Sequence, residues 1–225
     1  MEGSFGHFPV DIVVFALIAA FLALRLRSVL GKKVGFQTTP APHPTAPEPA
    51  GPVIEGRAEP TPATRFDIPG PNTRVGAMLG EVSKAERGFV PQQFLTGVEG
   101  AFRQVVAAYA SGNRATLKER LTPDAFAAFD AAVTARETAK ETQKSEIRAI
   151  DSVAIEDVRL MDTPAGKAAT IDVRIVSDQI SLVFDANGKP ITGMDAVTEF
   201  SDLWTFEKLL GVAGSSWRLA AARSA

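Results

Sequence analysis

The chain has 225 residues, of which 45% are hydrophobic, so it can bury one sizeable core. Its formal net charge of −2 leaves no polycationic surface, and nucleic acid is therefore not expected as a partner. Cysteine is absent, and the two histidines, His7 and His43, lie outside the part expected to fold, so we expect no disulfide, zinc site, His-based triad or other cofactor there.

The first 30 residues are expected to form a transmembrane anchor. Ile12 to Leu24 is an uninterrupted apolar run, and its flanks extend it to Val10–Leu30, long enough to span about 30 Å of hydrocarbon. A cleaved signal peptide or an interfacial helix is the alternative, but the segment lacks the basic start of a signal peptide. The residues of the anchor are Ile12, Val13, Val14, Phe15, Leu17, Ile18, Phe21, Leu22 and Leu24.

Basic residues flank only the C-terminal side of this segment, namely Arg25, Arg27, Lys32 and Lys33. Such side chains reach the membrane interface while their stems stay in the apolar layer. The positive-inside rule then places the N-terminus outside and the remainder of the chain in the cytoplasm, or on the equivalent matrix side.

Residues 31–72 have the composition of a disordered linker. Ten of the 15 prolines lie between Pro40 and Pro71, mixed with Ala, Thr and Glu. Such a segment cannot bury enough apolar surface to offset the entropy of ordering it, so we expect an extended tether. Its reach is roughly 35 Å as a coil and at most about 130 Å as a polyproline helix.

Residues 73–88 are expected to form a short amphipathic helix. Four apolar side chains recur there at helical spacing: Val75, Met78, Leu79 and Val82. Two interpretations remain open, because this apolar face can pack on the folded domain or lie on a lipid surface. Glu81 and Glu86 offset the basic residues of the segment, which weakens its attraction to an anionic membrane.

Three further helices are predicted after residue 90. An aromatic stripe at the helical period marks Pro91–Ala110 as the most regular helix, and Gly112 ends it. Asn113 can cap a short helix to Leu121, and Thr122 can cap the next helix. The stripe comprises Phe94, Val98, Phe102, Val105, Val106 and Tyr109, and the last helix presents Phe126, Phe129 and Val133.

The second half of the domain is expected to form four strongly bent strands. Apolar residues in Ala168–Asp185 alternate at odd positions and later at even positions, which predicts a β-bulge around Val176–Gln179. The preceding strand shows a similar slip across Glu156-Asp157. The expected strands are Arg148–Met161, Ala168–Asp185, Val197–Leu209 and Trp217–Ala222.

These elements predict an α+β fold in which about three helices and a strongly bent four-stranded antiparallel sheet form a cone. The cone comprises residues 89–225, and we expect Gly88–Ala225 to fold alone. The helix from Pro91 would lie across the concave face. The residues expected to fill the interior, or to line a pocket in it, are Phe94, Phe102, Val106, Phe126, Phe129, Ile171, Val173, Ile175, Trp204, Phe206 and Trp217.

Asp202 is the carboxylate that its position singles out. It shares the even-numbered face of its strand with Trp204 and Phe206, so a regular strand would direct it into the apolar cone. Burial there would favour its protonated form and would let it act as a general base. The alternative, which we favour, is a structural role at a bulge or in bonds to neighbouring backbone groups.

Several segments have sequence motifs in common with a known domain family. The most specific is Asp202-Leu-Trp-Thr-Phe-Glu207 followed by Trp217-Arg-Leu219. Others are Gln93-Phe-Leu-Thr-Gly97, Leu121-Thr-Pro123 and Ala169-Thr-Ile-Asp-Val-Arg-Ile175. Together they resemble the Tim44-like domain, a branch of the nuclear-transport-factor-two-like cone folds, over about Gly88 to Arg223.

The resemblance implies a non-enzymatic adaptor that binds a protein partner at a membrane. The N-terminal span and tether look like the bacterial branch of the family, called TimA, which implies a single-pass protein of the bacterial inner membrane. The mitochondrial relative tethers the matrix Hsp70 chaperone to the import channel and contacts cardiolipin-rich membrane, so the resemblance implies a role in protein translocation and contact with lipid. The alternative is a small-molecule or lipid binder, or a cone-fold enzyme that uses Asp202 as its general base.

Overall fold

The computed structural model describes residues 63–225, and the expected anchor and most of the expected linker lie outside this part. None of the helices in residues 63–225 has the length and apolar content of a membrane span. The helices are α2 (Arg74–Ala85), α3 (Pro91–Ser111), α4 (Arg114–Arg120) and α5 (Pro123–Thr138). The strands are β1 (Arg65–Asp67), β2 (Thr142–Thr163), β3 (Gly166–Phe184), β4 (Pro190–Leu209) and β5 (Arg218–Ser224).

The α+β arrangement is confirmed, but the prediction of a four-stranded antiparallel sheet is wrong in one respect. Strands β2 to β5 pair antiparallel in chain order, and β1 adds a fifth strand that runs parallel to β2. This strand lies in the segment expected to be linker. Phe66 and Ile68, two apolar residues among many prolines, pack against the core, and three residues are too few to show alternation.

The helices begin and end where local chemistry favours it. The side chain of Thr73 accepts a hydrogen bond from the N–H of Gly76, and Asn113 and Thr122 cap α4 and α5 in the same way. Gly112 follows α3 with φ of 70°, a left-handed conformation that glycine adopts without strain. The caps predicted at Asn113 and Thr122 are therefore confirmed.

The curvature of the sheet comes with several register shifts. The predicted slip at Glu156-Asp157 is confirmed, since the β2–β3 register shifts between Ile155 and Asp157. The change of phase predicted around Val176–Gln179 is confirmed at the end of that range, since the β3–β4 register shifts between Gln179 and Ser181 and the buried positions change there from odd to even. Inward positions continue through Ser177 and Gln179, which are 0% and 1% exposed and hydrogen-bonded to each other at 2.8 Å. Because these two inward residues are polar, the apolar pattern alone places the change of phase slightly too early in the strand.

Two strands are longer than the pattern of apolar residues indicated. Strand β2 begins at Thr142, where it pairs with Phe184, and β4 begins at Pro190. The first six residues of β2 are mostly polar, so alternation does not mark them. Their strand conformation depends on pairing with β3, which supplies their backbone hydrogen bonds.

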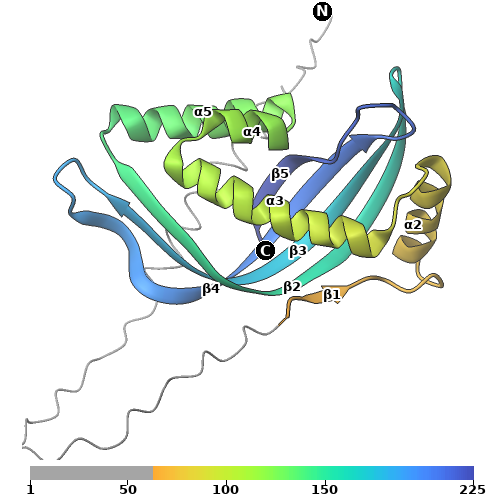
Figure 1. Ribbon diagram of the computed structural model, residues 1–225, viewed down its shortest axis with the longest axis horizontal. Coiled ribbons are helices and arrows are strands. Elements are labelled where there is room, and N and C mark those ends of the chain that lie inside the picture. The colour runs from red at the N-terminus through yellow and green to blue at the C-terminus, as the bar shows by residue number, and fades with distance from the viewer. Residues whose placement is uncertain (1–62) are drawn as a thin grey trace, which may run out of the picture.

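Helix α3 lies across the curved sheet, and the core forms between them (Figure 1). Phe102 of α3 is 0% exposed, and its ring centroid is 4.8 Å from that of Trp204 on β4. Helix α2 contributes Leu79 and Val82, which are 4% and 0% exposed, to the same core. The apolar face of α2 is thus covered by the domain, in agreement with the packing interpretation of residues 73–88.

Candidate functional site

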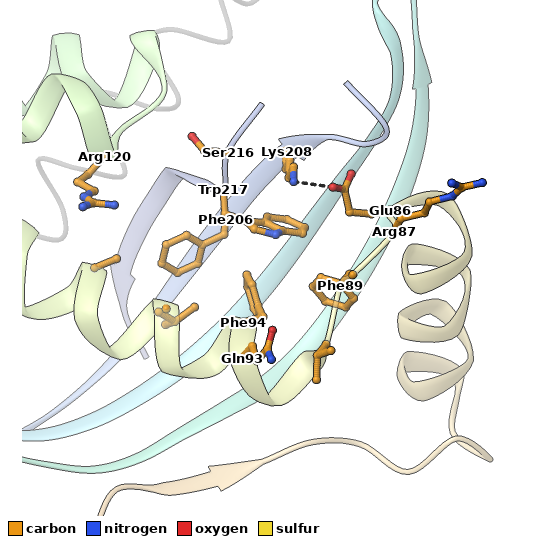
Figure 2. A pocket seen from close by; sticks show the side chains of 15 residues that line it. Glu86, Arg87, Phe89, Gln93, Phe94, Arg120, Phe206, Lys208, Ser216 and Trp217 are labelled. Carbon is orange, nitrogen blue, oxygen red and sulfur yellow. Dashed lines mark hydrogen bonds and ion pairs between the residues drawn. The ribbon is translucent and has the colours of Figure 1, made fainter. Parts of the chain in front are cut away.

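A pocket of about 380 Å³ opens beside the first half of α3, and four parts of the chain form its walls (Figure 2). They are the α2–α3 connection, the stretch of α3 from Gln93 to Ala101, the end of β4 with the two residues just before β5, and Arg120 of α4. The walls from the α2–α3 connection and from the end of β4 lie more than a hundred residues apart in the sequence. The pocket is therefore a product of the fold and not of any local motif.

Four aromatic side chains form the body of the pocket. The ring centroids of Phe94 and Trp217 are 4.9 Å apart, and Phe89 lies 5.8 and 5.9 Å from these two rings. Phe206 completes the set, 6.0 Å from Phe94 in an edge-on arrangement. Rings packed edge to face in this way hold each other in place. They provide a pre-formed apolar wall of the kind that ligand pockets use.

An ion pair closes one end of the pocket. Lys208 Nζ donates to Glu86 Oε1 at 2.9 Å, and the backbone N–H of Gly211 donates to Glu86 Oε2 at 2.7 Å. Both charged side chains are largely buried, with 13% of Lys208 and 19% of Glu86 exposed. The N–H of Gly211 and then the ammonium of Lys208 hold the pKa of the Glu86 carboxyl below its usual range. Glu86 thus joins the end of α2 to the β4–β5 connection.

Arg120 lies at the other end of the pocket (Figure 2). Its Nε is buried and, within the described residues, has no hydrogen-bond partner. In the same part of the chain, its ion-pair contact is with Glu119, the preceding residue, at a long distance of 3.5 Å. The side chain as a whole is 39% exposed, and a guanidinium pairs well with a planar anion. This end of the pocket can therefore receive a negatively charged group.

Glu86→Gln should lower the free energy of unfolding at neutral pH by about 1–2 kcal/mol, since it removes the charge from a hydrogen-bonded pair. The lowered pKa of Glu86 means that the wild-type contribution is present above the ordinary carboxyl range and is lost as pH falls through the folded-state pKa. The difference between the two proteins should therefore shrink between about pH 6 and pH 3. Urea unfolding measured at several pH values checks this.

Glu81→Gln on the same helix is the control. Glu81 pairs with Lys84 on the solvent-exposed surface, where 51% of its side chain is accessible. Exposed pairs of this kind contribute little, so this substitution should have a much smaller effect. A difference between Glu86→Gln and wild type that stays constant with pH would contradict the role assigned to this carboxylate.

Most of the residues expected in the cone interior lie in the core, and Phe94 and Phe206 belong both to the core and to the pocket lining. Phe94, Phe206 and Trp217 line the pocket, and Phe126 lines a second depression beside Leu121. Val106 is partly buried against the core. The remaining expected residues are buried in the core: Phe102, Phe129, Ile171, Val173, Ile175 and Trp204. The anchor residues and the interfacial basic residues lie outside the described part.

Asp202 is buried, with 4% of its surface exposed, but it is not among the residues that line the pocket. It pairs with Ile175 of β3, and no register shift on that side separates it from Trp204. It therefore shares the inner face with Trp204, as a regular strand requires. Within residues 63–225, no cluster of acidic or His side chains could hold a metal ion.

Three polar residues of the pocket were not recognised from the sequence. Glu86 and Lys208 are 122 positions apart, and Arg120 ends a short helix that looks like any solvated one. Phe89 was part of no periodic pattern. Pairing of charges across such separations becomes visible only once the helices are placed on the sheet.

Comparison with known proteins gives one family. The Tim44-like domain family matches residues 75–224, which include all the aromatic and charged residues of the pocket. Among solved structures, the intermembrane space region of the chloroplast protein ARC6 is similar, with 10% sequence identity and a TM-score of 0.41 over 58% of this chain and 95% of that one. No curated protein matches. The family match covers about two thirds of the chain, and the chain therefore belongs to the Tim44-like domain family.

Proposed function

We propose that this protein is a membrane-anchored, non-enzymatic adaptor whose Tim44-like domain binds a protein partner. The pocket beside α3 is the observation that carries this proposal. Its aromatic wall and the guanidinium of Arg120 can bind a ligand, while Glu86, the acidic residue of its lining, is engaged by Lys208 and Gly211. Among the described residues, the lining thus offers no free acid or base, which favours binding over catalysis.

The place of the domain in the cell is part of the same proposal. The apolar run Ile12–Leu24, with basic residues on its C-terminal side, supports a single span with the N-terminus outside and the domain in the cytoplasm. Membership in the Tim44-like family supports a role near a protein-translocation machinery of the inner membrane. The proline-rich segment would then act as the tether between the two.

A second candidate function uses the interior of the cone. Asp202 is buried on the inner face opposite Ile175, and the buried Ser177 lies two positions further along β3 on the same face. This supports a small-molecule or lipid binder, or an enzyme with Asp202 as general base. Asp202→Asn separates the candidates, because an adaptor should still capture its partner, whereas an enzyme should lose its activity on a small molecule.

Crosslinking of the full-length protein in native membranes, read by mass spectrometry, tests the adaptor function. The wild-type chain should capture a defined membrane-associated partner. Deletion of residues 1–30 should reduce the capture severalfold, because the tether raises the local concentration of the domain at the membrane. Replacement of Pro40–Pro71 by a Gly/Ser chain of similar reach should preserve it, since reach and not sequence matters.

Circular dichroism of each variant provides the control for folding. Equal capture of the same partner by the chain without its span, at matched expression, would contradict the anchoring role. Failure of the wild-type chain to capture any partner would contradict the adaptor function itself.

A further inference from the structure

We infer that the pocket beside α3 binds a peptide segment of the partner in which an apolar side chain stands next to a carboxylate. The inference rests on the proposed adaptor function and specifies the chemistry that the partner must present. An apolar anchor would lie in the pocket against the aromatic wall, and the carboxylate would pair with Arg120. Three features of the pocket support this assignment.

The first feature is the aromatic wall. Phe94, Phe206 and Trp217 hold one another in place by ring contacts of 4.9 and 6.0 Å, so the wall does not have to form on binding. Pre-formed apolar pockets that receive one aromatic or aliphatic anchor provide most of the affinity in protein–peptide contacts. The anchor gains from desolvation, which polar contacts on an exposed surface do not offer.

The second feature is the charge at one end. Of the three cationic residues in the described lining of the pocket, Lys208 is engaged by Glu86, and Arg87 extends away from the cavity (Figure 2). Arg120 remains, with a buried Nε that has no acceptor in the described part of the chain. The buried Nε is closed to a ligand, but 39% of the Arg120 side chain is exposed, so a ligand carboxylate can pair with the accessible part of the guanidinium. The selectivity should therefore be for acidic segments.

The third feature is the size and the rim. About 380 Å³ is near the lower end of the range of ligand pockets, roughly 300–1,000 Å³, which suits one or two side chains better than a two-chain lipid. Gln93 and Ser216 are exposed at the opening and can hydrogen-bond a peptide backbone. A protein segment thus matches both the floor and the rim of the pocket.

The chain itself offers a reporter. It contains two tryptophans, of which Trp217 lines the pocket and Trp204 is 3% exposed in the core. In full-length protein labelled with 5-fluorotryptophan, in phosphatidylcholine nanodiscs, fluorine NMR gives one signal for each. The peptide acetyl-Ser-Glu-Phe-Leu-Glu-Ser-amide should shift the Trp217 signal saturably and leave the Trp204 signal in place. The same peptide with Lys in place of Glu should bind about tenfold more weakly, a difference of one charged hydrogen bond.

Two sets of variants test the two halves of the site. Arg120→Gln should weaken binding of the acidic peptide about tenfold, Arg120→Lys should recover part of it, and Lys118→Gln on the same helix should change nothing. Gly97 lines the pocket, and a Cβ built there has no atom within 4 Å. Gly97→Leu should fill the pocket and abolish the shift without harm to α3, since leucine is the better helix former. Gly80→Leu, at an equally open position on α2, is its control.

Several results would overturn the inference. Equal binding of the acidic and basic peptides would do so, as would unchanged binding of the acidic peptide by Arg120→Gln or by Gly97→Leu. A shift of the Trp217 signal that phosphatidylglycerol nanodiscs cause and the peptide does not reverse would assign the pocket to lipid. Capture of a partner in native membranes distinguishes failure of the peptide site from failure of the proposed adaptor function. Capture that persists in Arg120→Gln and Gly97→Leu would leave the adaptor function intact and reject this site, whereas absence of capture by the wild-type chain would reject the adaptor function.

Discussion

Phe102→Ala should lower the free energy of unfolding by about 3–5 kcal/mol, the cost of a large cavity in a packed core. Phe102 is 0% exposed in the middle of α3, and its ring lies against Trp204 of β4. Its removal would take contacts from both the helix and the sheet. Urea unfolding followed by circular dichroism measures the change.

Gln92→Ala, at an exposed position on the same helix, is the control and should stay within about 0.5 kcal/mol of wild type. A cost below about 1 kcal/mol for Phe102→Ala would show that neighbouring side chains refill the space, and that α3 is held by other residues. Binding to the pocket need not change in a folded variant, because Phe102 does not line it.

A chain that begins at Gly88 should lose at least about 5 kcal/mol relative to a chain that begins at Ala63, because α2 and β1 are removed together. Leu79 and Val82 of α2 are core residues, and Glu86 bonds to the β4–β5 connection. Since domains of this kind are stable by only about 5–15 kcal/mol, the shorter chain should be largely unfolded. Thermal unfolding by circular dichroism tests the pair.

This result would go against the sequence-based expectation that Gly88–Ala225 folds alone. A chain from Ala63 with Leu79→Ala and Val82→Ala separates the contribution of the two side chains from that of the helix as a whole. If the chain from Gly88 melts at the same temperature as the chain from Ala63, α2 packs on the domain without stabilising it.

The sequence predicted those parts of the fold that have local causes. The period of α3, the caps at Asn113 and Thr122 and the alternation of β3 each result from neighbours in the chain. The first residues of β2 and the whole of strand β1 were not recognised, because their conformation depends on the strand beside them.

Buried polar residues were the second source of error. Ser177 and Gln179 are inward-facing and hydrogen-bonded to each other, and because they are polar the bulge of β3 was expected slightly before its position at Gln179 and Ser181. Arg136, in the last turn of α5, is another buried polar residue: it is 9% exposed and donates to the carbonyl of Tyr109 and to Gln143. Arg120 and Glu86 of the pocket were missed for a related reason, since their surroundings come from distant elements.

The parallel pairing of β1 with β2 has a mechanical consequence. β1 lies alongside Ser152–Ala154 before the chain turns into α2. A pull transmitted through the residues before Arg65 would act along the strand, so the β1–β2 hydrogen bonds would share the load in shear and would not open one after another. The chain between β1 and α2 packs closely against this helix, since a Cβ on Gly76 would collide with the carbonyl oxygen of Gly70. A force applied to the chain before Arg65 would thus reach the sheet first through β1, its outermost strand.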